Sequence, residues 1–166
     1  MKTIFTKDLP NKKMYITREF AASRNQVWQA WTDPVLLDQW WAPKPWQART
    51  KHMDFNVGGY WLYCMQGPDG TQSWGRADYK AIDTINSFEG EDIFCDDHGM
   101  TNDAFPKMYW KNLFSDTADG NTMVSVEVTY ASQADLEKII EMGFETGFSM
   151  AHENLDEVLA SLNPPL

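Results

Sequence analysis

The stretch "SRNQVWQAWTDPVLLDQWW", residues 23–41, predicts two short helices that follow one another directly. Ser23 and the glutamine three residues after it have the form of a capping box, in which side chains satisfy free backbone N–H groups of a first helical turn. Asp33 followed by Pro34 has the form of a second helix start, because proline is favoured at the first helical position. Apolar residues recur at three- and four-residue steps in both segments, so each helix has one face suited to a core.

The residues before this stretch predict one strand and a lead-in. The segment "MYITREF", residues 14–20, alternates loosely between polar and apolar side chains, which is typical of a strand. Residues 1–12 carry dispersed lysines among polar residues, and we expect them to be a flexible N-terminal lead-in. No repeat, low-complexity tract or linker divides the remainder, so residues 13–166 are expected to form a single domain.

Residues 46–131 have a different pattern, in which short apolar-polar alternations are separated by turn signals. The segment "NTMVSVEVTYA", residues 121–131, places apolar side chains on one face and polar side chains on the other. Because there is no room for crossover helices, we expect an antiparallel meander of six strands that is covered on one side only. Gly58, Gly59 and Gly75 are the expected sites of bulges or sharp bends.

The C-terminal segment, residues 132–162, predicts one long amphipathic helix. Ser132 is its expected N-cap, and Asn163 and Pro164 are expected to end it. Apolar side chains recur along it at three- and four-residue steps, whereas its other face is acidic and solvated. A curved antiparallel sheet with this helix laid across its concave face buries both apolar surfaces, which gives an α+β fold.

Composition excludes several classes of partner. The formal net charge is −10, and such a surface repels a phosphate backbone, so nucleic acid is not expected as a partner. No apolar run approaches the roughly 20 residues of a membrane span, and we expect no membrane insertion and a cytoplasmic location. The two cysteines, Cys64 and Cys95, are too few for a disulfide framework in a chain of this length.

The order of elements and three segments of sequence resemble the START/Bet v (SRPBCC) superfamily. Within it, the chain is similar to the family named for the C-terminal domain of the heat-shock-protein-90 ATPase activator. The resemblance spans residues 15–162, and its segments are "FAASRNQVWQAWTDPVLLDQWWAP", "DFNVGGYWLYCMQGPDGTQSWGRADYKAI" and "EMGFETGFSMAHENLDEVLASL". It implies a helix-grip (Bet v-like) fold, in which the sheet wraps the C-terminal helix and leaves a cavity. In the wider superfamily this cavity holds lipids, sterols, polyketides, flavonoid-like aromatics or plant hormones.

One departure from the resemblance concerns chaperones. The eukaryotic co-chaperones of this family have a separate N-terminal domain with a basic activating segment, and only about a dozen residues precede the first expected strand here. We therefore do not expect the chain to stimulate a chaperone ATPase.

The sequence offers little conventional catalytic chemistry. His52, His98 and His152 lie far apart and form no ligand-like pair with another histidine or a cysteine, so no metal site is expected. The cluster "CDDHG", residues 95–99, is more typical of a solvated turn than of a cation or acid-base site. Nucleophile-elbow, phosphate-loop and dinucleotide motifs are absent, so we expect no cofactor.

The expected cavity is therefore the candidate site. Flat aromatic side chains and flexible methionines suit a planar apolar ligand, although the same residues also fill ordinary cores. The residues that we expect to bind the ligand are Trp41, Trp61, Tyr63, Met65, Tyr79, Trp110, Phe144 and Phe148. Trp41 is expected at the cavity mouth, while most of the remaining tryptophan-rich segment, residues 40–46, is expected in the core.

Three functions remain open from the sequence. The leading hypothesis is a non-enzymatic protein that binds a small hydrophobic or aromatic ligand. The second is a cyclase- or isomerase-type enzyme that uses the same cavity, for which Tyr63, Tyr79, Arg76 and His152 are the candidate polar groups. The third is an interaction module, either chaperone-linked or a homodimer formed through exposed aromatic strand faces.

Overall fold

A computed structural model describes residues 1–162 and contains, within that range, one antiparallel sheet and four helices. The sheet order is β1-β2-β8-β7-β6-β5-β4-β3. The strands are β1 (Ile4–Asp8), β2 (Lys13–Phe20), β3 (Gln47–Met53), β4 (Tyr60–Gln66), β5 (Gln72–Asp83), β6 (Ser87–Cys95), β7 (Met108–Asp116) and β8 (Thr122–Tyr130). The helices are α1 (Arg24–Thr32), α2 (Pro34–Trp40), α3 (Gln133–Glu141) and α4 (Phe144–Leu162).

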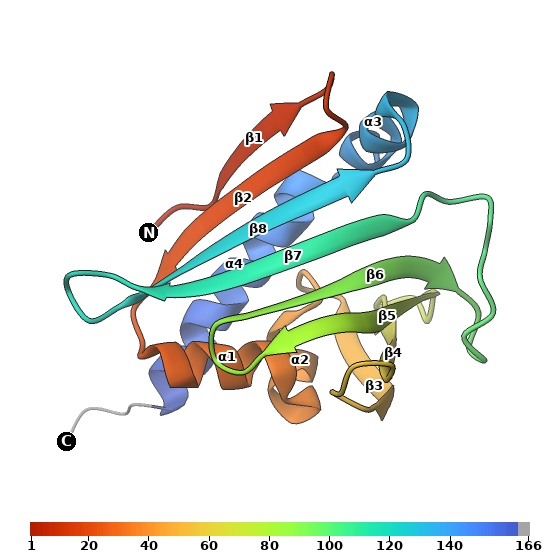
Figure 1. Ribbon diagram of the computed structural model, residues 1–166. Helices are drawn as coiled ribbons and strands as arrows, with labels where there is room; N and C mark the ends of the chain where they lie inside the picture. The colour runs from red at the N-terminus through yellow and green to blue at the C-terminus, as the bar shows by residue number, and fades with distance from the viewer. Residues whose placement is uncertain (163–166) are drawn as a thin grey trace.

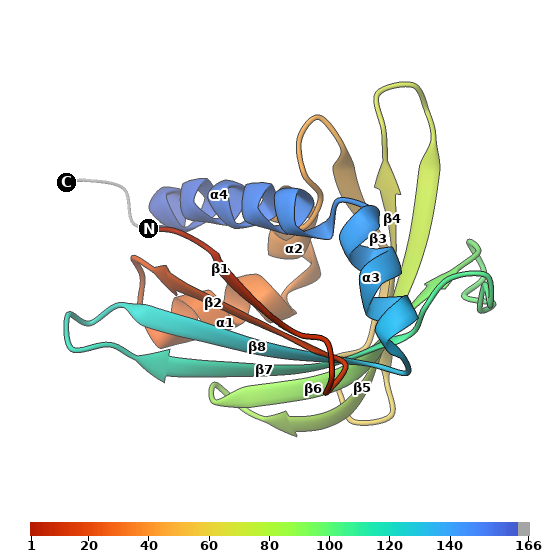
Figure 2. The ribbon, with the colours of Figure 1, turned by 90° about the horizontal axis from the view of Figure 1, so that it is seen from above.

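The sheet curves so that the helices lie on its concave side (Figures 1 and 2). In Figure 2, α4 lies along the strands β1, β2 and β8, while the hairpin of β4 and β5 rises at the other side of the molecule. The buried core is formed between this concave face and the helices α1, α2 and α4. This architecture confirms the predicted helix-grip fold.

The two predicted helix starts are confirmed. The Ser23 hydroxyl accepts a hydrogen bond from the Gln26 backbone N–H at 3.3 Å, and the Asp33 carboxylate accepts one from Val35 at 2.8 Å. The Trp40 indole N–H donates to the Ala30 carbonyl at 2.9 Å, and the side chain is fully buried. This bond joins α2 to α1, and Trp40 is a core residue, as expected, whereas Trp46 of the same segment is only half-buried and lies outside the core.

The prediction of a flexible lead-in over residues 1–12 is wrong for Ile4–Asp8, which form strand β1. This strand pairs antiparallel with β2 over five residue pairs, from Ile4 with Thr17 to Asp8 with Lys13. The Phe5 ring packs edge-on against the Phe144 ring of α4, with 6.3 Å between centroids. A strand of five residues with mixed polarity carries little periodic signal, so the sequence does not distinguish it from a polar lead-in.

The prediction of one helix over residues 132–162 is also wrong, because the helix is broken at Gly143. This glycine has φ +84°, which no residue of a right-handed helix adopts, and it follows the C-cap of α3. A left-handed glycine at that position is a common helix terminator because it has no Cβ. The chain therefore changes direction there, and α3 and α4 are separate in Figure 2. Asn163 and Pro164 lie outside the described residues.

The prediction of bulges or sharp bends is correct only for a bend at Gly58, which has φ +89° and lies in the turn between β3 and β4. The bulges lie elsewhere, since register shifts occur between Thr50 and His52 in β3 and between Tyr79 and Ala81 in β5. Gly75 is required for another reason: a Cβ there would lie 2.7 Å from both Cζ and Oη of Tyr63. A glycine in strand β5 thus makes room for the Tyr63 ring to lie across it.

Candidate ligand-binding cavity

A cavity of about 260 Å³ lies between strands β4 to β7, the α3–α4 junction and the first two turns of α4. Its walls are almost entirely apolar. The lining residues are Trp41, Pro43, Tyr63, Met65, Ser73, Trp74, Gly75, Asp92, Ile93, Phe94, Met108, Trp110, Ile139, Met142, Gly143, Phe144, Gly147 and Phe148.

The strand register explains why side chains from four strands meet in this cavity. Tyr63 of β4 pairs with Gly75 of β5, which in turn pairs with Phe94 of β6. Asp92, two residues before Phe94, pairs with Met108 of β7. Since side chains of a strand alternate between its two faces, these residues all belong to the concave face.

Aromatic rings form the walls of the cavity and fix one another. The Trp41 ring lies 5.9 Å from Phe148 of α4 and 6.1 Å from Trp110 of β7, measured between centroids. The rings of Phe144 and Phe148 are stacked at 5.3 Å with an angle of 22° between their planes. Such rings are rigid and largely apolar, so the cavity presents flat surfaces on several sides.

Six of the eight side chains expected at the site line this cavity: Trp41, Tyr63, Met65, Trp110, Phe144 and Phe148. The other two, Trp61 and Tyr79, line a separate space of about 30 Å³. The Tyr79 hydroxyl donates to the Met53 sulfur at 3.4 Å, and burial raises the pKa of its phenol. Trp61 and Tyr79 are thus neighbours of the cavity rather than parts of its wall. Trp41 lines both spaces.

Sequence reasoning missed Asp92, the one carboxyl group among the lining residues. It lines both the cavity and the smaller space. Burial raises the pKa of Asp92 to about 8, and the nearby charges of Asp78 and Glu91 add to the rise. The carboxyl group is therefore mostly uncharged at neutral pH.

A signal for Asp92 was present in the sequence. The segment "SFEGEDIFC", residues 87–95, alternates so that Asp92 shares a face with Phe88 and Phe94, whereas Glu89 and Glu91 share the other. The run of three acidic residues within four positions resembles an ordinary solvated strand face. Only the assignment of the aromatic residues to the concave side distinguishes Asp92 from its acidic neighbours.

Two other polar candidates from the sequence do not reach the cavity. Arg76 of β5 forms an ion pair with Asp78, at 2.9 Å from Nε to Oδ1, and also donates a hydrogen bond to the Gly99 carbonyl. Arg76 belongs to the strand positions that alternate with Gly75 and Ala77, so it lies on the convex face. His152 of α4 is fully buried and is joined to the Thr3 hydroxyl by a hydrogen bond of 2.9 Å.

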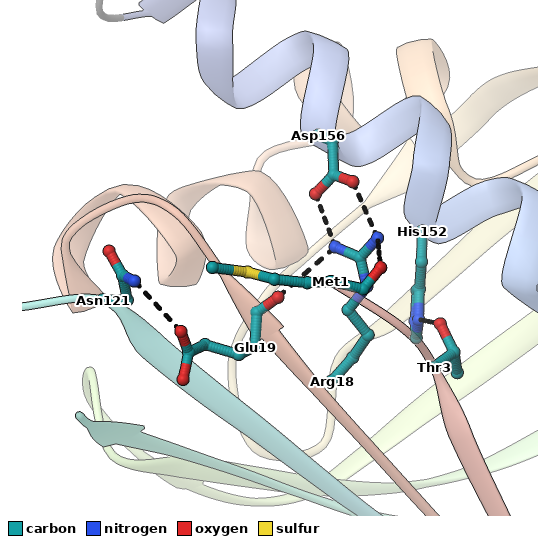
Figure 3. A network of polar contacts seen from close by, with 7 residues as sticks. All are labelled: Met1, Thr3, Arg18, Glu19, Asn121, His152 and Asp156. Carbon is teal, nitrogen blue, oxygen red and sulfur yellow. Dashed lines mark hydrogen bonds and ion pairs between the residues drawn. The ribbon is translucent and has the colours of Figure 1, made fainter. Parts of the chain in front are cut away.

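A polar network fixes the C-terminal half of α4, away from the cavity (Figure 3). The Arg18 guanidinium donates to both Asp156 oxygens, at 2.5 and 2.7 Å, and to the Met1 carbonyl at 3.1 Å. Burial lowers the pKa of His152 to about 3, and the nearby Arg18 charge contributes. His152 is thus neutral in the folded protein, and its role is to join the N-terminal segment to α4.

The "CDDHG" segment is a turn, as expected. The Asp96 carboxylate accepts backbone hydrogen bonds from His98 and Met100, both at 2.9 Å. These bonds lower the pKa of Asp96, which stays ionised and exposed. The Asp96 carboxylate thus finds its hydrogen-bond partners in the backbone of its own turn.

Comparison with known proteins agrees with this geometry. Residues 21–160 match the family described as activator of Hsp90 ATPase homolog 1-like protein. The chain belongs to this family. A search of curated proteins gives no match.

Two solved structures of related proteins share the whole architecture. A protein from Mycobacterium smegmatis, Ms6760, is 33% identical with a TM-score of 0.88, and the match covers 96% of this chain and 97% of that one. A protein from Arthrobacter aurescens is 32% identical with a TM-score of 0.88, covering 95% of this chain and 91% of that one. The AHSA1 protein from Silicibacter pomeroyi, at 16% identity and a TM-score of 0.71 over 91% and 99% of the two chains, shares the fold.

The helices do not suggest a membrane-spanning segment. Among residues 1–162, no helix combines the length and the apolar composition that a bilayer crossing requires.

Proposed function

We propose that this protein binds a small, planar, largely apolar molecule in the cavity between the sheet and α4. The observation that carries the proposal is the cavity itself: about 260 Å³ walled by aromatic rings, with a single carboxyl group. Core side chains normally pack to a density that leaves few voids larger than a water molecule. A space of this size, left unfilled by side chains as large as Trp41 and Phe148, supports a ligand-binding role.

The α3–α4 junction supports the same proposal. Gly143 and Gly147 both line the cavity, and glycine contributes no side chain to fill it. A Cβ at Gly147 would meet only Pro43 Cγ, at 3.7 Å, which is an ordinary contact distance. Packing against a neighbouring backbone thus does not explain Gly147, and space beside the helix does.

The test is a screen of planar aromatic compounds, flavonoids, polyketides and lipids by thermal shift, followed by chemical-shift perturbation. We expect compounds with two or three fused rings to raise the melting temperature and to shift the signals of lining residues. The matched control is Gly147→Leu, which adds a side chain to the cavity wall and is expected to abolish these effects while the fold is kept. If no compound binds, or if binding is unchanged in Gly147→Leu, the proposal fails.

A cyclase- or isomerase-type enzyme is the second candidate, and Asp92 is the observation that favours it. A carboxyl group with a pKa of about 8 inside an apolar cavity has the properties of a general acid. Turnover of a ligand found in the screen, lost in Asp92→Asn, would establish this activity. Unchanged ligand after prolonged incubation would exclude it for that ligand.

A further inference from the structure

Asp92 has an uncommon environment for a carboxyl group. No hydrogen bond joins its carboxyl oxygens to any of residues 1–162, and lysine, arginine and histidine are missing from the cavity lining in this range. The acidic groups that act on it are Asp78 and Glu91, which belong to the convex-face positions of β5 and β6. The other titratable groups coupled to it are the phenols of Tyr63, Tyr79 and Tyr130. An acid in these surroundings keeps its proton and becomes a hydrogen-bond donor without an acceptor.

Tyr63 brings a second donor to the same part of the cavity. Its ring lies across Gly75, so that its hydroxyl reaches over β5 toward the strand that carries Asp92. Burial and the Asp92 charge raise the pKa of the Tyr63 phenol, which therefore also keeps its proton. The Trp41 indole N–H acts on the phenol oxygen of Tyr63, although Trp41 has no partner within hydrogen-bond geometry. Within the described residues, no hydrogen bond joins the Tyr63 hydroxyl to an acceptor.

We propose that Asp92 and Tyr63 are a pair of hydrogen-bond donors that recognise a carbonyl oxygen on the planar ligand. This inference rests on the proposed function and names the ligand class, an aromatic ketone or a related conjugated carbonyl compound. Both side chains are half-buried, and a ligand that covers them without supplying an acceptor leaves their donors unpaired, so a ligand with an acceptor gains over one without. A tyrosine beside an uncharged carboxylic acid in an apolar site is an arrangement that is known to bind oxygen atoms of ketones and enolates.

An organic ammonium ion is the alternative occupant, since aromatic rings and a carboxylate also attract cations. That ligand would need the ionised form of Asp92. The ionised form is the minor one below about pH 8, and the charges of Asp78 and Glu91 oppose it. A carbonyl oxygen instead uses the form that prevails at neutral pH.

Three probes of nearly equal shape separate these possibilities. They are 2-acetylnaphthalene, its hydrocarbon counterpart 2-isopropenylnaphthalene, and 1-(2-naphthyl)ethylamine, each titrated at pH 6.5 and followed by tryptophan fluorescence. We expect the ketone to bind roughly fivefold or more tightly than the hydrocarbon, which corresponds to one or two neutral hydrogen bonds. Equal affinities of ketone and hydrocarbon overturn the inference but leave the proposed function intact. Binding of none of the three overturns both, and preference for the amine assigns a cation site instead.

Variants identify the donors. In Asp92→Ala and in Tyr63→Phe one donor remains, and the preference for the ketone is expected to fall roughly twofold to threefold in each, whereas Asp92→Asn retains a donor and most of the preference. Tyr109→Phe, which removes a phenol hydroxyl that donates to Glu89 and does not line the cavity, is the matched control and is expected to leave the preference unchanged. In the wild type the preference is expected to decline as the pH rises through about 8, and in Asp92→Asn to be independent of pH. A preference that is undiminished in both Asp92→Ala and Tyr63→Phe overturns the inference, and thermal unfolding of each variant verifies that it is folded.

Discussion

The ring of Tyr63 lies so close to Gly75 that a Cβ at Gly75 would be 2.7 Å from the phenol carbon Cζ and from the hydroxyl oxygen. Tyr63 is also stacked on Trp61, at 4.1 Å between centroids and with 25° between the ring planes. The ring is thus held between a neighbouring strand and a neighbouring indole. Both contacts fix the position of the ring in the cavity wall.

Gly75→Ala is expected to displace the Tyr63 ring and to weaken ligand binding. The added methyl group cannot be accommodated at 2.7 Å, so the ring must leave its stacked position on Trp61. We expect a loss of stability of about 1–3 kcal/mol, the usual cost of overpacking, measured by urea unfolding. The three atoms nearest to the added methyl group all belong to Tyr63, so Tyr63→Ala in the same background is expected to recover part of the loss. No loss in Gly75→Ala would show that the contact does not constrain the ring.

Replacing Gly143 and Gly147 by alanine is expected to change the stability of the protein in opposite directions. Gly147→Ala is expected to stabilise the protein by about 0.5–1 kcal/mol, because it lies within α4 and has space for a methyl group. Gly143→Ala is expected to destabilise by about 1 kcal/mol, because its φ of +84° is unfavourable for any residue with a Cβ. Thermal or denaturant unfolding of the two variants is the measurement. The same sign for both would contradict the placement of the helix break at Gly143.

The ion pair of Arg18 with Asp156 is expected to stabilise the packing of α4 on β2. Asp156→Asn leaves the Arg18 guanidinium, which is only 3% exposed, without its charged partner. Because Asp156 itself is 43% exposed and solvent screens the pair, we expect a loss of about 1–2 kcal/mol rather than the larger cost of a fully buried pair. The control is Glu157→Gln, which breaks the exposed pair with Lys44 and is expected to change stability by less than about 0.5 kcal/mol. Equal effects of the two variants would contradict this account.

His152 is expected to make the fold sensitive to mild acid. Its pKa is about 3 in the folded protein and near 6.5 in the unfolded chain, so below pH 6.5 the unfolded state binds more protons. The stability that His152 contributes is therefore present above pH 6.5 and is lost progressively as the pH falls toward 3. Urea unfolding at pH 7 and at pH 5 measures the loss, with His152→Gln as the variant and His98→Gln, at an exposed position, as the control. A loss between pH 7 and pH 5 that is identical in the wild type and in His152→Gln would exclude His152 as its source.

Asp92 is expected to make the fold less stable at high pH, whereas His152 makes it less stable at low pH. Its pKa is about 8 in the folded protein against 3.8 for an ordinary aspartate, so between these values the folded state binds more protons. Its favourable contribution is complete below pH 3.8 and is lost as the pH rises toward 8. We therefore expect Asp92→Asn to be more stable than the wild type at pH 8.5, on the order of 2 kcal/mol, and equal to it near pH 4. Equal stability at pH 8.5 would show that Asp92 is ionised and well solvated.

The elements with strong local signals were predictable from the sequence. Ser23 and Asp33 mark helix starts with capping chemistry that depends on a few adjacent residues, and the alternation in residues 121–131 fixes a face of β8. The break at Gly143 was not predictable in the same way, because apolar residues keep helical spacing on both sides of it. A glycine within such a pattern fits a helix interior as well as a helix end.

The residues of the candidate site also differ in how far the sequence predicts them. Trp41, Tyr63 and Phe148 could be assigned to a cavity from side-chain type and strand or helix face. Trp61 lines the separate space, and its ring packs against that of Trp41 at 5.3 Å between centroids. This side-chain packing is not determined by any sequence pattern. The alternation in β6 places Asp92 on the same face as Phe88 and Phe94, but which face is concave is a tertiary property, seen in the pairing of Asp92 with Met108 of β7.

The most direct test of the account is a titration of the wild-type protein with 2-isopropenylnaphthalene, followed on the assigned indole N–H signals. We expect saturable shifts at Trp41 and Trp110, which line the cavity, and no shift at Trp46, which does not. We also expect that Gly147→Leu loses the shifts at Trp41 and Trp110. Saturation that is absent from Trp41 and Trp110, or shifts that persist unchanged in Gly147→Leu, would contradict the claim that this cavity is a ligand-binding site.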